Sequence, residues 1–107
     1  FAGGQGGRSH VAAPGEAGAD VEAVDIFPVL DETDLLKMDI EGGEWPILAD
    51  ARLRTTPIKA ICMEYHARFC PGENATTTAT ALLSEAGFDI VSVREEAPGG
   101  VLWALRR

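Results

Sequence analysis

The sequence is poor in cationic side chains. It carries 9 Lys and Arg against 17 Asp and Glu, which gives a formal net charge of −8 at pH 7. A surface that binds nucleic acid needs clustered cations to displace counterions from the phosphates, and an anionic membrane attracts the same residues. We therefore expect neither nucleic acid nor a membrane surface among the partners of this chain.

Long apolar runs are also missing. No stretch approaches the roughly 20 apolar residues that a membrane-spanning helix needs. The chain opens at Phe1 without an initiator Met, a signal-peptide pattern or a targeting segment. These absences predict a cytoplasmic domain, and the start at Phe1 suggests a piece of a longer protein.

Cysteine is scarce as well. Cys62 and Cys70 are the only two, and their spacing matches neither a CxxC redox pair nor a zinc ribbon. Two thiols in a reducing compartment are the favoured interpretation, and a disulfide between them is the minor alternative.

What remains is enough for one small domain over residues 1–107, with 46% hydrophobic and 24% charged residues. Residues 1–20 are rich in Gly and Ala and are expected to form a flexible or irregular lead-in. Gly3–Gly7 resembles a phosphate-binding loop, but no strand precedes it and Ser9 stands where a dinucleotide fingerprint has its third glycine. Short strands are expected over residues 9–12 and 21–26.

Apolar periodicity is much clearer from Leu35 onward. Leu35–Ile40 predicts a buried strand, and Glu41–Gly43 predicts a tight turn in which glycine allows positive φ. A helix is expected to begin at Glu44 and to end at Thr55–Pro57. Its buried stripe is predicted from the spacing of Trp45, Leu48 and Ala49.

The second half repeats this alternation. Ile58–Tyr65 predicts a strand, residues 67–74 a loop, and Thr76–Ala86 an amphipathic helix with Asn74 or Thr76 as its cap and Gly87 as its stop. Residues 88–95 and 101–105 predict a β-hairpin, with Trp103 in the core. The order strand, helix, strand, helix, hairpin predicts an α/β fold with parallel strands.

Acidic residues gather where the two strong strands end. Asp39 and Glu41 share one face of a regular strand, and so do Glu64 and His66. If the strands are parallel neighbours, these four could meet in one crevice and act as a general base, hold a cation or orient a hydroxyl group. The alternatives are solvated strand ends, a Lys37–Asp39 ion pair and, for Glu44, a favourable charge at a helix N-terminus.

The segment Leu35–Trp45 resembles the signature of FkbM-type S-adenosylmethionine-dependent methyltransferases. It contains the pattern Lys-x-Asp-x-Glu-Gly-x-Glu between Lys37 and Glu44. The resemblance continues through Met63–His66, Leu82–Phe88 and Gly100–Ala104, so it covers the chain from about Val21 to the C-terminus.

This resemblance implies a partial Rossmann-like sheet of class I methyltransferases, with Leu35–Ile40 as the fourth strand, Ile58–Tyr65 as the fifth and an antiparallel last strand. It implies S-adenosylmethionine as methyl donor and O-methylation of a hydroxyl on a small-molecule or sugar-like acceptor. The implied catalytic residues are Asp39, Glu41 and His66, and the implied substrate-binding residues are Glu44 and Glu64.

The chain departs from the family in its first part. The glycine-rich donor loop and the acidic residue after the second strand are not recognisable in Phe1–Asp20. We therefore expect the C-terminal half of a methyltransferase, inactive and without tight donor binding when alone. Its strand Leu35–Ile40 is then expected to leave an open edge for self-association.

Two other functions stay open at this point. One is an interaction module that keeps the fold without catalysis. The other is a metal-dependent hydrolase or phosphoryl-transfer domain using Asp39 and Glu41 with Glu64, although the sequence shows no complete set of metal ligands.

Overall fold

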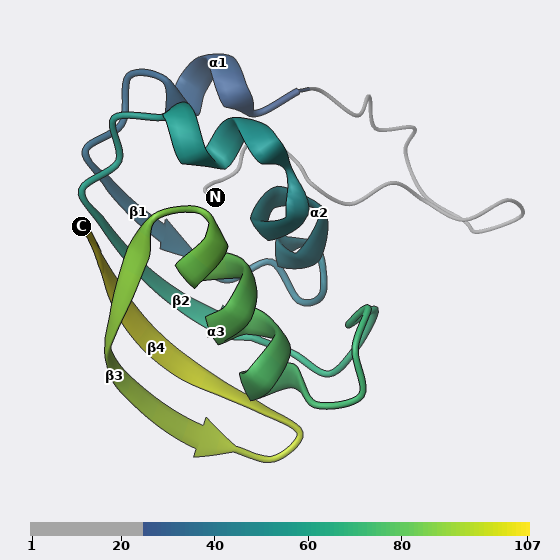
Figure 1. The fold of residues 1–107 in the computed structure, drawn as a ribbon. Helices are drawn as coiled ribbons and strands as arrows, with labels where there is room; N and C mark the ends of the chain where they lie inside the picture. The colour runs from purple at the N-terminus through teal and green to yellow at the C-terminus, as the bar shows by residue number, and fades with distance from the viewer. Residues whose placement is uncertain (1–24) are drawn as a thin grey trace, which may run out of the picture.

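The computed structural model describes residues 25–107. In chain order, these residues form α1 (Phe27–Leu30), β1 (Leu35–Met38), α2 (Glu44–Ala49), the 3₁₀ helix η1 (Ala51–Thr55), β2 (Ala60–Tyr65), α3 (Ala75–Glu85), β3 (Phe88–Glu96) and β4 (Gly99–Arg106) (Figure 1). The predicted lead-in and the strand over residues 9–12 lie outside the described residues. Asp25 and Ile26, the described end of the other weak strand, are not in a strand.

The four strands form one mixed sheet in the order β1-β2-β4-β3. β1 runs parallel to β2, with Leu36 opposite Ile61, whereas β4 is antiparallel to both β2 and β3. The predicted α/β fold with a parallel pair and a C-terminal hairpin is confirmed. β1 stops at Met38, two residues before the predicted end. Self-association through its outer edge stays a prediction.

One face of the sheet carries the core. Along β2 and β4, alternate side chains such as Ile61, Met63 and Leu102 are buried. Helix α3 lies across this face and contacts β2, β3, β4 and α2 (Figure 1). The α3 helix begins at Ala75, one residue before the predicted start. Of the two predicted caps it is Asn74 whose side chain accepts a hydrogen bond from the Thr77 N–H at 2.9 Å, and Gly87 follows the helix with φ of +99°.

Trp103 corrects the prediction of a core residue, because its exposed fraction is 43%. It lies between buried Leu102 and Ala104 on β4, so its side chain points to the opposite face of the sheet. Leu35 and Leu105 are exposed as well, at 59% and 46%. None of the described helices buries these three side chains, which explains why an apolar strand pattern alone misplaced the indole.

Helix α2 is shorter than predicted. It ends at Ala49, and η1 continues the chain to Thr55. Asp50 caps the start of η1, because its side chain accepts a 2.9 Å hydrogen bond from the Arg52 N–H. Trp45 and Leu48 are buried as expected, but Ala49, the last residue of the helix, is exposed. The predicted stripe is therefore right for two of its three residues.

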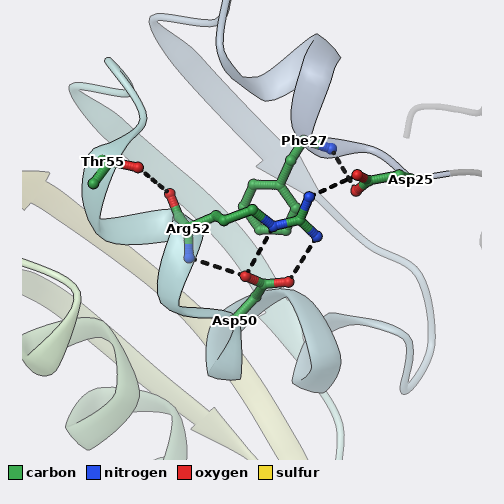
Figure 2. A network of polar contacts seen from close by, with 5 residues as sticks. All are labelled: Asp25, Phe27, Asp50, Arg52 and Thr55. Carbon is green, nitrogen blue, oxygen red and sulfur yellow. Dashed lines mark hydrogen bonds and ion pairs between the residues drawn. The ribbon is translucent and has the colours of Figure 1, made fainter.

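A polar network fixes α1 against η1 (Figure 2). The Arg52 guanidinium binds Asp25 at 2.6 Å and Asp50 at 2.9 Å, and lies 4.2 Å from the centroid of the Phe27 ring. Hydrogen bonds from Arg52 lower the pKa of both aspartates and raise that of the guanidinium. This network joins residues 27 positions apart on the surface of the domain.

Arg106, near the end of β4, joins three segments. Its guanidinium donates to carbonyl oxygens of Ile58 at 2.9 Å, Ala86 at 3.0 Å and Thr56 at 2.7 Å, and stacks 4.1 Å from the centroid of the Phe88 ring. Partial burial lowers its pKa. These contacts tie the ends of η1 and α3 to the sheet.

The cysteines agree with the favoured interpretation of two thiols. Cys62 and Cys70 are free and partly buried. None of the helices within residues 25–107 combines the length and the apolar character that a membrane crossing requires.

Candidate functional site

The carboxyl ends of β1 and β2 lie side by side. These strands are parallel, and their last paired residues are Met38 and Met63. Asp39 and Glu64 are the next residue in each chain segment, so the register places them next to each other. His66 follows two residues after Glu64. The structure therefore brings together three residues that the sequence placed at two separate strand ends.

The His66 imidazole lies near both carboxylates. Its Nε2 atom is 3.9 Å from Asp39 Oδ1 and 3.9 Å from Glu64 Oε1. One ligating atom from each of the three residues lies within 4.8 Å of the other two. The side chains of Asp39 and Glu64 are about half exposed and that of His66 is 27% exposed, so the cluster is open to solvent.

The neighbouring carboxylates of Asp39 and Glu64 repel each other. The charge of Asp39 is the largest cause of a raised pKa for Glu64, with desolvation as a further cause, and the nearby His66 partly offsets it. A raised pKa of a carboxyl group at a strand end marks a place where negative charge is concentrated.

Glu44 lies beneath this cluster and is fully buried. Its Oε1 accepts a hydrogen bond from the Gly42 N–H at 2.8 Å, and its Oε2 accepts one from the His66 N–H at 2.7 Å. The same Oε2 lies 3.1 Å from His66 Nδ1. This contact orients the imidazole so that Nε2 faces Asp39 and Glu64.

The turn after β1 is shaped by its neighbours. Glu41 and Gly42 both have positive φ, of 46° and 101°. A Cβ atom at Gly42 would lie 2.8 Å from the Phe69 ring and 3.1 Å from the Arg68 carbonyl oxygen, so only glycine fits under this loop. The turn and the loop over residues 67–70 are therefore packed directly on one another.

Trp45 holds the same loop from below. Its indole N–H lies 3.0 Å from the carbonyl oxygens of both His66 and Arg68. We expected Trp45 only as a core residue, and it is buried, but it also positions the backbone around His66. The signal was present in the sequence, since a buried indole N–H needs an acceptor.

The predicted site residues fall into three groups. Asp39, Glu64 and His66 meet, and Glu44 supports His66 from the buried side. Glu41 does not share a face with Asp39, because the strand ends at Met38 and the turn rotates Glu41 away from a regular strand path. Among residues 25–107, no ion pair joins Lys37 to Asp39. The charged neighbour of Asp39 is His66. The catalytic and substrate-binding roles of these residues stay predictions.

A hydrolase site built on Asp39, Glu41 and Glu64 is weakened by the same turn. The group of described residues with metal-ligand spacing contains His66 in place of Glu41. The replacement of Glu41 by His66 in this group could not be predicted from the sequence pattern, because the prediction extended a regular strand beyond Met38.

Comparison with protein families gives one match. The family model described as the methyltransferase FkbM domain matches residues 10–90. The match begins before Val21, where the sequence resemblance was expected to start, and it ends inside β3. Comparison with curated proteins finds no match, and comparison with solved structures finds none either.

Proposed function

We propose, given that this chain belongs to the FkbM methyltransferase domain family, that it takes part in S-adenosylmethionine-dependent O-methylation of a hydroxyl group. The acceptor is a small molecule or a sugar-like compound. The sheet then corresponds to part of a Rossmann-like class I methyltransferase fold, in which β1 and β2 are adjacent parallel strands.

One observation carries the proposal. In a chain of this family, an open cluster of Asp39, Glu64 and His66 stands at the carboxyl ends of two parallel strands, where α/β sheets bind their ligands. The half-exposed Asp39 side chain is accessible to an acceptor. The exposed loop segment with Phe69, whose exposed fraction is 70%, lies close to the turn that follows Asp39.

The chemistry on the acceptor side follows from these groups. A hydroxyl oxygen that gains a methyl group must lose its proton. The Asp39 carboxylate can accept a hydrogen bond from this hydroxyl and take the proton as the new O–C bond forms. His66 faces the same opening through Nε2, and Glu64 lines this opening as well. Glu44 would act by orienting His66.

The described residues do not fit the methyl donor, which supplies the methyl group in this family. The glycine turn after β1 has no room for a donor. Its Gly42 N–H is taken by Glu44 and its Gly43 N–H by the Ile40 carbonyl oxygen, and the Phe69 ring fills the space above Gly42. We assign no described residue to donor binding.

We expect weak donor binding by the 107-residue chain, because the sequence Phe1–Asp20 has no recognisable donor loop either. Isothermal titration with S-adenosylmethionine is expected to give no micromolar binding. A micromolar dissociation constant would contradict the assignment, because it would require a donor cradle among these residues.

Product analysis tests the reaction itself. The full-length natural protein that contains these residues is incubated with S-adenosylmethionine and a panel of polyols, sugars and phenols. Mass spectrometry is expected to find one added methyl group on an oxygen of at least one acceptor. Methylation at nitrogen or carbon alone, or no methylated product, would contradict the proposal.

A further inference from the structure

We propose that Phe69 contacts the acceptor and selects compounds whose hydroxyl group is attached to a ring with an apolar face. The inference rests on the proposed function, because it places the phenyl ring against the acceptor of that reaction. Phenols and pyranose sugars share this chemistry, whereas open-chain polyols have no ring face to offer.

The Phe69 side chain is an apolar ring that the protein leaves in water. Its exposed fraction of 70% is the highest among the large apolar side chains that are exposed within residues 25–107. Removing apolar surface from water is favourable, so an exposed ring beside a ligand site is a ready contact for an apolar ligand surface. Single exposed apolar residues are common, however, so the argument needs the backbone and the position of this residue as well.

The backbone of Phe69 distinguishes it from an ordinary surface residue. Its φ is +63°, in the left-handed region that bulky side chains rarely adopt. Such a conformation persists only where its surroundings fix it, and it concentrates at active sites and ligand clamps. Glu41, in the turn after β1, is the other described non-glycine residue with positive φ. The two strained residues lie in the two segments that follow β1 and β2.

Two hydrogen bonds fix the loop that carries Phe69. The Trp45 indole N–H donates to the Arg68 carbonyl oxygen at 3.0 Å, immediately before Phe69. The Cys70 N–H, immediately after it, donates to the Ala67 carbonyl oxygen at 3.1 Å and closes a turn. Neither contact covers the exposed side of the ring. The ring is therefore held in one place while it stays open to a ligand.

The position of the ring is tied to the cluster at the ends of β1 and β2. Phe69 follows His66 by three residues, and the glycine under its ring, Gly42, follows Asp39 by three residues. The buried Glu44 carboxylate accepts hydrogen bonds from both the Gly42 N–H and the His66 N–H. One side chain thus connects the glycine under the ring to the histidine of the cluster. The exposed ring and the half-exposed Asp39 carboxylate lie at the same end of the sheet.

A flat group already lies over the Phe69 ring. The Arg68 guanidinium is 4.7 Å from the ring centroid. Planar guanidinium groups stack on aromatic faces, and aromatic rings pack against one another at similar centroid distances. Arg68 is exposed, so an acceptor ring can take the place of its guanidinium. The carboxylates of Asp39 and Glu64 concentrate negative charge nearby, which favours an uncharged acceptor over an anionic one.

Binding of ring compounds without donor tests the inference first. In the full-length natural protein labelled with ¹³C-phenylalanine, the Phe69 ring signals are those that disappear in Phe69→Leu. Phenol and methyl glucoside, titrated separately, represent the two sources of the ring. At least one of them is expected to shift the Phe69 signals, and glycerol is expected to leave them in place. Signals that neither ring compound moves, or that glycerol moves equally, would overturn the inference.

Steady-state kinetics of methyl transfer to the ring compound that binds give the second readout. Phe69→Ala is expected to raise KM about tenfold and to leave kcat nearly unchanged, because the ring binds the acceptor and takes no part in proton transfer. Phe69→Tyr keeps the ring and is expected to retain the KM of the wild type. Equal KM values for Phe69→Ala and the wild type would contradict the assignment.

Trp103→Leu is the matched control. Trp103 is an exposed aromatic residue of β4 on the face of the sheet away from the core, and its variant is expected to keep the wild-type KM. Circular dichroism checks that every variant keeps its fold. If the protein methylates no acceptor, the proposed function fails, and the titration without donor still decides whether Phe69 binds a ring.

Discussion

The buried carboxylate of Glu44 binds His66 twice, at the backbone N–H through a 2.7 Å hydrogen bond and at the imidazole Nδ1 over 3.1 Å. These contacts join the first turn of α2 to the end of β2. The exposed cluster of Asp39, Glu64 and His66 therefore rests on a carboxylate that solvent does not reach. The Glu44 side chain therefore contributes both to the stability of the fold and to the geometry of the cluster.

Glu44→Gln is expected to destabilise the protein. Both carboxylate oxygens accept hydrogen bonds from N–H groups, so either orientation of the amide turns its NH₂ toward one of them. A buried donor left without an acceptor costs about 1 to 3 kcal/mol. Urea denaturation is expected to show a loss of unfolding free energy of this size.

Glu32→Gln is the control for this comparison. Glu32 is exposed, and its variant is expected to change the unfolding free energy by less than about 0.5 kcal/mol. An unfolding free energy of Glu44→Gln equal to that of Glu32→Gln would show that the buried contacts do not stabilise the fold.

Arg106→Lys is expected to lower the free energy of unfolding, although the exchange keeps the positive charge. The guanidinium donates to carbonyl oxygens of Ile58, Thr56 and Ala86 at once, and a single ammonium group cannot reach all three from one position. The expected loss is about 2 to 3 kcal/mol of unfolding free energy. Arg94→Lys, at an exposed ion pair with Glu96, is expected to cost less than about 1 kcal/mol. Equal losses in the two variants would contradict this assignment.

The Arg52 network predicts a pH dependence of stability. Hydrogen bonds from Arg52 lower the pKa of Asp25 and Asp50 in the folded state below the ordinary value of 3.8. Their stabilising contribution is therefore complete above 3.8 and is lost as the pH falls through the lowered folded-state pKa values.

The stability difference between the wild type and Arg52→Gln measures this contribution. It is expected to stay constant from neutral pH down to about 5 and to shrink below 3.8. Urea denaturation of both proteins across a pH series gives the difference at each pH. A difference that grows on acidification would show that the aspartates are not the partners that matter.

Much of the fold could be predicted from local patterns. The runs that became β1 and β2 are apolar and rich in strand-forming residues, and Asn74 and Gly87 mark the ends of α3 by their own chemistry. The meeting of Asp39 with Glu64 and His66 could be predicted as well, because parallel neighbours end at the same edge of a sheet.

Other features depend on contacts between distant segments. Glu41 leaves the strand path because the turn packs under Phe69, which lies far along the chain. The burial of Glu44 could not be foreseen, since glutamate is rarely buried without partners and one of its partners, His66, follows β2 far along the chain. Trp103 is exposed because the described helices cover the other face of the sheet, which an alternating pattern in a single strand does not reveal.

The rate of methyl transfer in an Asp39 variant tests the central claim most directly. In the full-length natural protein, Asp39→Asn keeps the size of the side chain but removes its ability to take a proton, and kcat is expected to fall by about a hundredfold or more. Asp34→Asn is expected to retain the wild-type kcat. An Asp39→Asn variant with the kcat of the wild type would contradict the account, because it would place the acceptor site away from the ends of β1 and β2.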